Sequence, residues 1–140
     1  MLAMLGVLSA AACGGETTSA TPTPLIVFAM VAQNGSGASG TGTVVRGADS
    51  FTITVKLTRL EPSSSHISHL HDGACGAPGG IAFALKQVIA DSAGAATITS
   101  TIPAGYLVPA SGWYVNVHHG PDFTEDEYAP SDSCGDLPHA

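Results

Sequence analysis

One eight-residue run constrains the fold more than any other feature of this chain. From Phe51 to Thr58, apolar and polar side chains alternate without a break. Successive side chains of an extended strand point to opposite faces, so Phe51, Ile53, Val55 and Leu57 share one face. The run therefore predicts a strand with one face in a core and the other in solvent.

Five other segments favour strands, and turn sequences separate them. The segments are 25–31, 42–46, 81–90, 95–102 and Trp113–His118. The turns are Asn34-Gly35, 47–49, 91–94 and 110–112. The alanine-rich start of 81–90 also fits a helix, but the alternation of Phe83, Leu85 and Gln87 favours a strand. No window of about 12 residues shows a capped helical period. We therefore predict an all-β, antiparallel Greek-key sandwich or barrel of about seven to eight strands.

Charge and composition exclude two classes of protein. Four Lys and Arg against 11 Asp and Glu give a formal net charge of −7, which argues against a nucleic-acid partner. A hydrophobic share of 44% with only 11% charged residues argues against a disordered chain. The length of 140 residues fits one folded domain.

The first 12 residues have the composition of a targeting segment. They are almost wholly apolar and too few to span a bilayer, and small residues stand directly before Cys13. This pattern resembles the lipobox of bacterial lipoproteins, with cleavage before Cys13 and a lipid on its sulfur. Ala10 stands where leucine is usual, and no Lys or Arg precedes Arg46. An ordinary secretory signal with a coincidental cysteine is the alternative.

These features predict the organisation of the whole chain. Residues 1–12 form a signal peptide of the lipoprotein type, and residues 13–24, rich in Thr, Ser, Gly and Pro, form a flexible tether. Residues 25–140 form the β-sandwich domain. We expect an extracytoplasmic protein, at the cell surface or in the periplasm, that is held to the membrane by its lipid alone.

The two remaining cysteines support export. Cys75 and Cys134 lie 59 positions apart, and in an exported chain such a pair indicates one disulfide. Metal ligation by thiolate is the alternative, but neither cysteine has a Cys-x-x-Cys partner.

Histidine is the residue type with the most informative positions. Five of the six histidines fall in two clusters, which are His66, His69 and His71, then His118 and His119. In an extended strand His69 and His71 share one face, so both imidazoles can reach one ion. Imidazole suits copper, zinc and nickel. The clusters therefore predict a metal site, and the alternative is a set of surface histidines that make hydrogen bonds.

The second cluster ends a predicted strand. Val115 and Val117 take one face of this strand, and Asn116 and His118 take the other. If the valines face the core, His118 points outward, and His119 points inward or lies where the strand ends.

The order of these motifs resembles that in the copper/zinc superoxide dismutases. The resemblance covers the layout of residues 25–137, but its specific motifs cover only about 20 residues. The motifs are His69-x-His71, Cys75, the run Tyr114-Val115-Asn116-Val117-His118 and the run Ser133-Cys134-Gly135-Asp136-Leu137. The chain also resembles bacterial CHRD-type domains, which carry a His-Ile-His element followed by glycine and a late YVNVH strand.

The resemblance implies an eight-stranded, superoxide dismutase-like Greek-key β-sandwich with a Cys75–Cys134 disulfide. It also implies copper ligation by His69, His71 and His118. His66 and His119 are close in sequence to these residues and are candidates for additional ligands.

Two departures from the dismutase pattern disfavour that activity. No histidine lies between His71 and His118, so the bridging ligand and the zinc site are absent. Ser131, Asp132 and Ser133 occupy the positions where dismutases carry a guiding arginine. Residues 122–132 hold five acidic side chains and no Lys or Arg, so their field repels an anionic substrate and attracts cations. We therefore assign no catalytic residues.

The sequence thus predicts an exported, lipid-anchored copper-binding β-sandwich that binds or handles metal at the cell surface. Zinc is the alternative metal, and the sequence identifies no protein partner. Two other functions stay open. One is a copper-only, dismutase-like enzyme, and the other is a non-catalytic CHRD-type interaction module with structural histidines.

Overall fold

The computed structural model describes residues 13–15 and 25–139. The predicted signal peptide (1–12) and most of the predicted tether (13–24) lie outside the described residues. Cys13 is exposed and carries a free thiol, and its lipidation stays a prediction. Within the described residues, no helix is long and apolar enough to cross a membrane.

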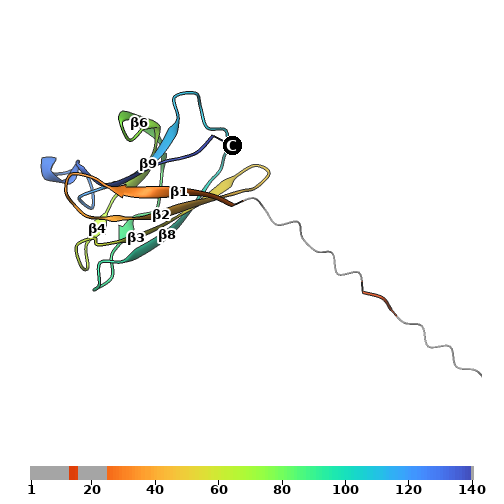
Figure 1. Ribbon diagram of the computed structural model, residues 1–140, viewed down its shortest axis with the longest axis horizontal. Coiled ribbons are helices and arrows are strands. Elements are labelled where there is room, and N and C mark those ends of the chain that lie inside the picture. The colour runs from red at the N-terminus through yellow and green to blue at the C-terminus, as the bar shows by residue number, and fades with distance from the viewer. Residues whose placement is uncertain (1–12, 16–24, 140) are drawn as a thin grey trace, which may run out of the picture.

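The described domain consists of ten strands and one short 3-10 helix (Figure 1). In chain order the elements are β1 Leu25–Ala32, β2 Ser39–Arg46, β3 Phe51–Thr58, β4 Ser65–His66, β5 Ser68–Ala74, β6 Ala77–Ala84, β7 Val88–Ile89, β8 Ala96–Ile102, β9 Trp113–His118, η1 Asp126–Tyr128 and β10 Ser131–Asp136. This architecture confirms the predicted all-β fold class.

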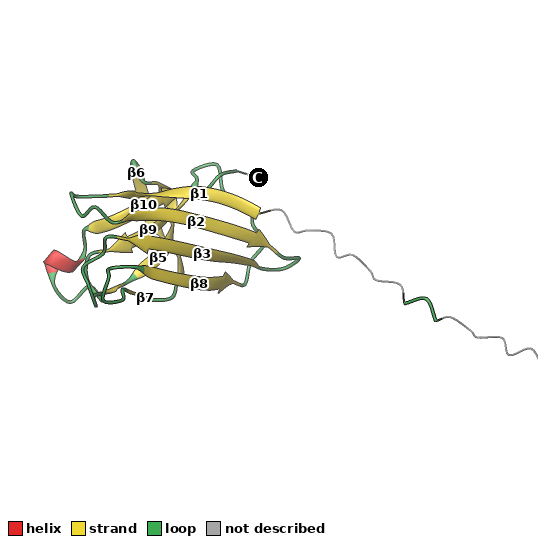
Figure 2. Cartoon of the chain, turned by 60° about the horizontal axis from the view of Figure 1, so that its bottom comes forward, coloured by secondary structure: helices red, strands yellow, loops and turns green. Residues whose placement is uncertain are grey.

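Eight of the strands form a single antiparallel sheet that curls around one core (Figure 2). Their order is β6-β5-β9-β10-β1-β2-β3-β8, and β4 pairs with β7 separately. Leu70 and Val115 from one half of the sheet belong to the same core cluster as Ile53 and Val44 from the other half. The two halves of the curled sheet are therefore packed face to face like the layers of a sandwich.

The alternation of the sequence decides which face of each strand is buried. Phe51, Ile53, Val55 and Leu57 of β3 are each at most 2% exposed. The hydroxyls of Thr52 and Thr54 point outward and pair with Thr101 and Thr99 of β8, at 3.1 and 2.9 Å. The predicted half-buried strand is confirmed. These paired threonines cover the outer face of the sheet with satisfied polar groups.

The predicted turn at Asn34-Gly35 connects β1 to β2. Asn34 has a φ of 51° and Gly35 a φ of 74°, so both residues occupy the left-handed region. Asparagine and glycine tolerate this conformation better than other residues. Local sequence therefore sets the position of the first hairpin.

The predicted strand over 81–90 has the wrong bounds. β6 ends at Ala84 and β7 begins only at Val88. Between them, the backbone N–H of Leu85 donates to the carbonyl of Ser68, and that of Lys86 donates to Oγ of Ser100. The chain leaves the β5 edge here and crosses toward β8, so no single strand can continue through residues 85–87.

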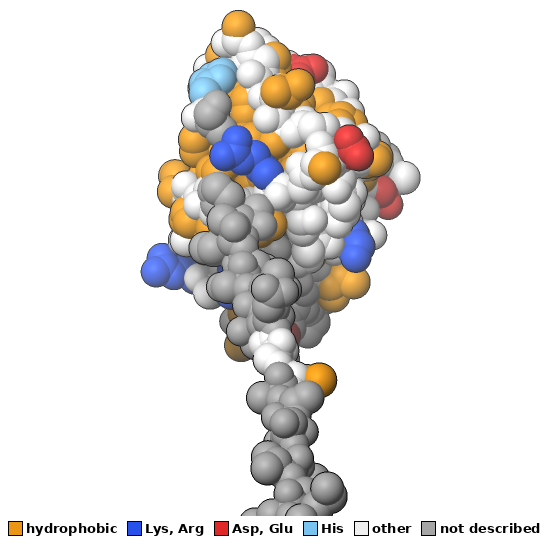
Figure 3. Space-filling view, turned by 90° about the vertical axis from the view of Figure 1, so that its right-hand side faces the viewer, with side chains coloured by type: hydrophobic (Ala, Val, Ile, Leu, Met, Phe, Trp, Pro, Cys, Tyr) orange, Lys and Arg blue, Asp and Glu red, His pale blue; other side chains and the backbone are white. Residues whose placement is uncertain are grey.

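The face of the domain shown in Figure 3 has no single chemical character. On this face of the described chain, the few Lys and Arg side chains lie scattered among apolar and acidic ones. This surface therefore offers no basic patch, in agreement with the formal net charge of −7.

Candidate metal centre

The pairing of β5 with β9 brings three histidines together. His69 lies opposite Asn116, and His71 lies opposite Tyr114. His118 is two residues beyond Asn116 and therefore shares its face. Each histidine offers one ring nitrogen, and these nitrogens lie within 4.8 Å of one another. We call His69, His71 and His118 the histidine triad; its members are 6%, 8% and 7% exposed.

The core holds this face in place from behind. Leu70, Val115 and Val117 point to the opposite side of β5 and β9 and are fully buried. A one-residue slip of either strand would exchange these apolar side chains with the histidines. The buried face therefore sets the register that assembles the triad.

Backbone carbonyls fix the orientation of two of the rings. Nδ1 of His71 lies 3.1 Å from the carbonyl oxygen of Gly79, and Nδ1 of His118 lies 2.7 Å from that of Ala129. A carbonyl can only accept, so each Nδ1 carries the proton and each Nε2 keeps its lone pair. Nε2 of His71 and Nδ1 of His69 are buried without a hydrogen-bond partner. Hydrogen bonds from the non-ligating ring nitrogen to a backbone carbonyl commonly orient the histidines that bind metals in proteins.

Aromatic side chains form the walls around the triad. Phe123, from the loop between β9 and η1, stacks on His69 with ring centroids 5.7 Å apart and meets His118 edge-on at 4.8 Å. Tyr114 stacks on His71 at 5.0 Å. These rings shield the imidazoles from water and leave their unpartnered nitrogens facing one another.

This environment favours the neutral forms of His69 and His118. Burial, together with the nearby His118 and His71, lowers the pKa of His69 from 6.5 to about 4. Burial also lowers the pKa of His118, against the opposing effect of its hydrogen bond to Ala129. His69 is thus uncharged at neutral pH, which is the form that binds metal.

The lowered pKa of His69 predicts a pH-dependent stability of the metal-free protein. The unfolded chain takes up this proton near pH 6.5 and the folded one only near pH 4. The contribution of His69 is therefore complete above pH 6.5 and is lost as pH falls toward 4. We expect a loss of roughly 1–3 kcal/mol across this window.

Urea denaturation at pH 7.5 and 4.5 measures this loss, with His69→Gln as the control. The variant keeps the same carboxylates, so the difference between the two proteins isolates His69. Equal losses of stability in the wild type and the variant would show that the His69 pKa is not displaced.

The structure does not bring His66 or His119 into the triad. His66 is 1% exposed, and its two nitrogens lie 2.6 Å from Oγ of Ser64 and 2.9 Å from the carbonyl oxygen of His118. His119 follows the last residue of β9, and its half-exposed ring contacts Oδ1 of Asp132 at 3.1 Å. Oδ2 of the same carboxylate lies 3.5 Å from His66. These two histidines therefore flank Asp132, while the triad lies on the other side of the β9 backbone.

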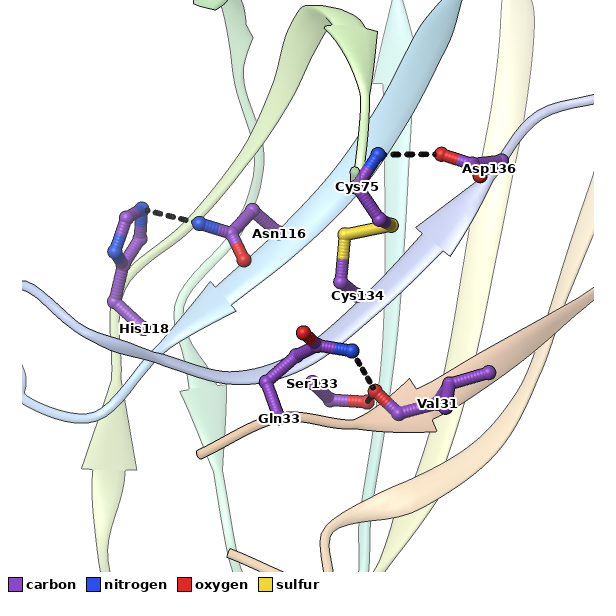
Figure 4. The surroundings of a disulfide bond; sticks show 8 residues. All are labelled: Val31, Gln33, Cys75, Asn116, His118, Ser133, Cys134 and Asp136. Atoms are coloured by element: carbon purple, nitrogen blue, oxygen red, sulfur yellow. Dashed lines mark hydrogen bonds between the residues drawn. A yellow bond between two sulfur atoms is a disulfide. The ribbon is translucent and has the colours of Figure 1, made fainter. Parts of the chain in front are cut away.

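Cys75 and Cys134 form a disulfide, as predicted, and this pairing replaces the alternative of thiolate ligation. Cys134 of β10 lies opposite Asn116, and Cys75 directly follows β5. Because β9 lies between β5 and β10, the bond links the two strands that flank the strand of His118. Figure 4 shows the disulfide beside Asn116, whose amide points toward His118.

Two residues that contact the triad, Asn116 and Phe123, were not predicted as site residues from the sequence. Asn116 shares its face with His118, and its Nδ2 lies 3.2 Å from Nε2 of His118. The parity of β9 already placed the two side chains together, so that signal was present. Phe123 lies in an acidic loop with no periodicity, so the sequence offered no sign that it packs on the triad.

Comparison with known proteins identifies one protein family that matches most of the chain. A model of the CHRD domain family matches residues 22–121, a segment that holds β1 to β9, the histidine triad and Cys75. A search of curated proteins finds no match to the chain. The expected CHRD resemblance is confirmed, while the resemblance to the dismutases stays a prediction.

Proposed function

The chain belongs to the CHRD domain family, and we propose that it binds one copper ion through the histidine triad. One observation carries this proposal. Three buried imidazoles converge within 4.8 Å, and two of their nitrogens have no hydrogen-bond partner. A buried polar atom left unpaired is costly, on the order of 1–3 kcal/mol, and a bound cation relieves that cost.

The donor set fits a copper or zinc ion. Nitrogens that bind one ion at about 2.1 Å are at most about 4 Å apart, so small ring rotations close the site. Three imidazoles suit both metals. Copper is our proposal because the resemblance to the dismutases implies it, and zinc is the competing ion because three imidazoles also form zinc sites.

We further propose that the protein works outside the cytoplasm, attached to the membrane through Cys13. The Cys75–Cys134 disulfide supports this location, since such bonds persist in oxidising compartments. In this setting a buried triad would bind or handle metal at the cell surface.

Membership of the CHRD family and the burial of the triad favour a non-catalytic module over a dismutase. The triad histidines are at most 8% exposed, and Phe123 covers two of them. Asp132 occupies one of the positions where a guiding arginine would attract superoxide. The site thus gives a small anion neither an open path nor an attractive field.

Titration of the full-length protein with Cu(II) and Zn(II) tests the proposal. We expect one tightly bound ion, and an affinity at least about 100-fold weaker in His69→Ala/His71→Ala, because losing two ligands costs more than losing a residue that only hydrogen-bonds to a ligand. His119→Ala is the matched control and should bind like the wild type. Unchanged affinity in the double variant would contradict the proposal.

The enzyme alternative has its own assay. We expect superoxide decay with the copper-loaded protein to be no faster than with a chelator-treated sample. Faster decay that disappears in the double histidine variant would establish the dismutase function instead.

A further inference from the structure

We propose that Asn116 controls which copper oxidation state the triad prefers, an inference that rests on the proposed copper site. Asn116 is 5% exposed and lies on β9 directly opposite His69 of β5. Its Nδ2 is 3.2 Å from Nε2 of His118, while its Oδ1 is buried without a hydrogen-bond partner.

The direction of the bond between Asn116 and His118 follows from the partners of the imidazole. Nδ1 of His118 donates to the carbonyl of Ala129, so Nε2 has only a lone pair to offer. Nδ2 of Asn116 must then be the donor. In the metal-free site, this amide occupies the lone pair that His118 would give to an ion (Figure 4).

A metal ion and an amide N–H cannot share one lone pair. Metal binding at His118 must therefore break this hydrogen bond. A half-turn about the Cβ–Cγ bond of Asn116 exchanges the positions of Nδ2 and Oδ1. The rotated side chain presents to the ion an oxygen that had no partner before.

An amide carbonyl oxygen binds some metal ions more strongly than others. Amide and carboxylate oxygens suit harder cations, whereas the softer Cu(I) prefers thiolate, thioether and imidazole. Asn116 therefore stabilises Cu(II) through Oδ1 and opposes Cu(I), which must break the same hydrogen bond without gaining a useful ligand. The residue acts as a positioning and selectivity residue of the triad.

The midpoint potential of the copper-loaded, full-length protein tests this role. We expect Asn116→Leu to weaken Cu(II) binding about tenfold and to leave Cu(I) binding unchanged or tighter, which raises the one-electron potential by about 59 mV or more. Asn116→Asp keeps an oxygen and adds negative charge, so it should lower the potential. A purely structural role would weaken both oxidation states together and leave the potential unchanged.

Gln33→Leu is the matched control, because it removes an amide outside the triad and should not change the potential. The side-chain amide resonances of Asn116 in the wild-type protein give a second test that needs no variant. They should shift on addition of Zn(II), as Nδ2 leaves His118. An unchanged potential in both Asn116 variants, or amide resonances unmoved by bound Zn(II), would overturn the inference. A wild type that takes up no metal would overturn the proposed function as well.

Discussion

Replacing Cys75 and Cys134 together by serine is expected to lower the free energy of unfolding by about 4 kcal/mol. The bond closes a loop with a sequence separation of 59 and so restricts the conformations of the unfolded chain. Its removal restores that conformational entropy to the unfolded chain, which stabilises the unfolded state. The bond also links the two strands that flank β9. We therefore expect the strands that carry the histidine triad to exchange amide hydrogens faster in the variant.

Guanidinium denaturation of the oxidised wild type and the double serine variant measures this difference. Cys13→Ser is the matched control, because Cys13 is an exposed free cysteine and its loss should leave the stability unchanged. A difference below about 1 kcal/mol between the wild type and the double variant would mean that loop closure contributes little here.

Strands with one face in solvent and one in the core were predicted from their own sequence pattern. β3 shows a burial pattern that alternates as its sequence does, and so does β8. In β3 every inward residue is apolar, and in β8 all inward residues except Ser100 are apolar, so the period is visible without any tertiary information.

Burial on both faces hides this signal in β5, which was not among the predicted strand segments, but β9 was predicted with the bounds that the structure shows, Trp113–His118. In β5 the four residues Ser68 to His71 are all buried, and every residue of β9 is buried. The outer side chains of these strands are polar but covered, so polarity no longer marks exposure. β10 was not predicted as a strand for a related reason. Its residues Ser131 to Asp136 are small or polar, and their pairing with β1 and β9 depends on partners far away in the sequence.

Parity makes the face of each triad histidine predictable from the sequence, but their convergence also requires the pairing of β5 with β9, which only the resemblance to the dismutases implied. His69 and His71 share a face by spacing, and the valines of β9 identify which face His118 takes. The separate placement of His66 and His119 was not predictable. It depends on Asp132, which approaches both rings from β10. Which histidines join a cluster is thus decided by long-range packing, even when their strand positions are known.

Saturating copper is expected to raise the free energy of unfolding by about 4 kcal/mol when the free ion is at about 1,000 times its dissociation constant. The gain arises because the folded chain brings together nitrogens that two separate strands carry. Thermal or urea unfolding with and without Cu(II) measures it, and His71→Gln is the control that removes one ligand. Ion binding to the unfolded chain would act on both proteins alike and oppose the gain. Only the wild type should therefore be stabilised strongly, and an equal increase in His71→Gln would show that the ion binds elsewhere.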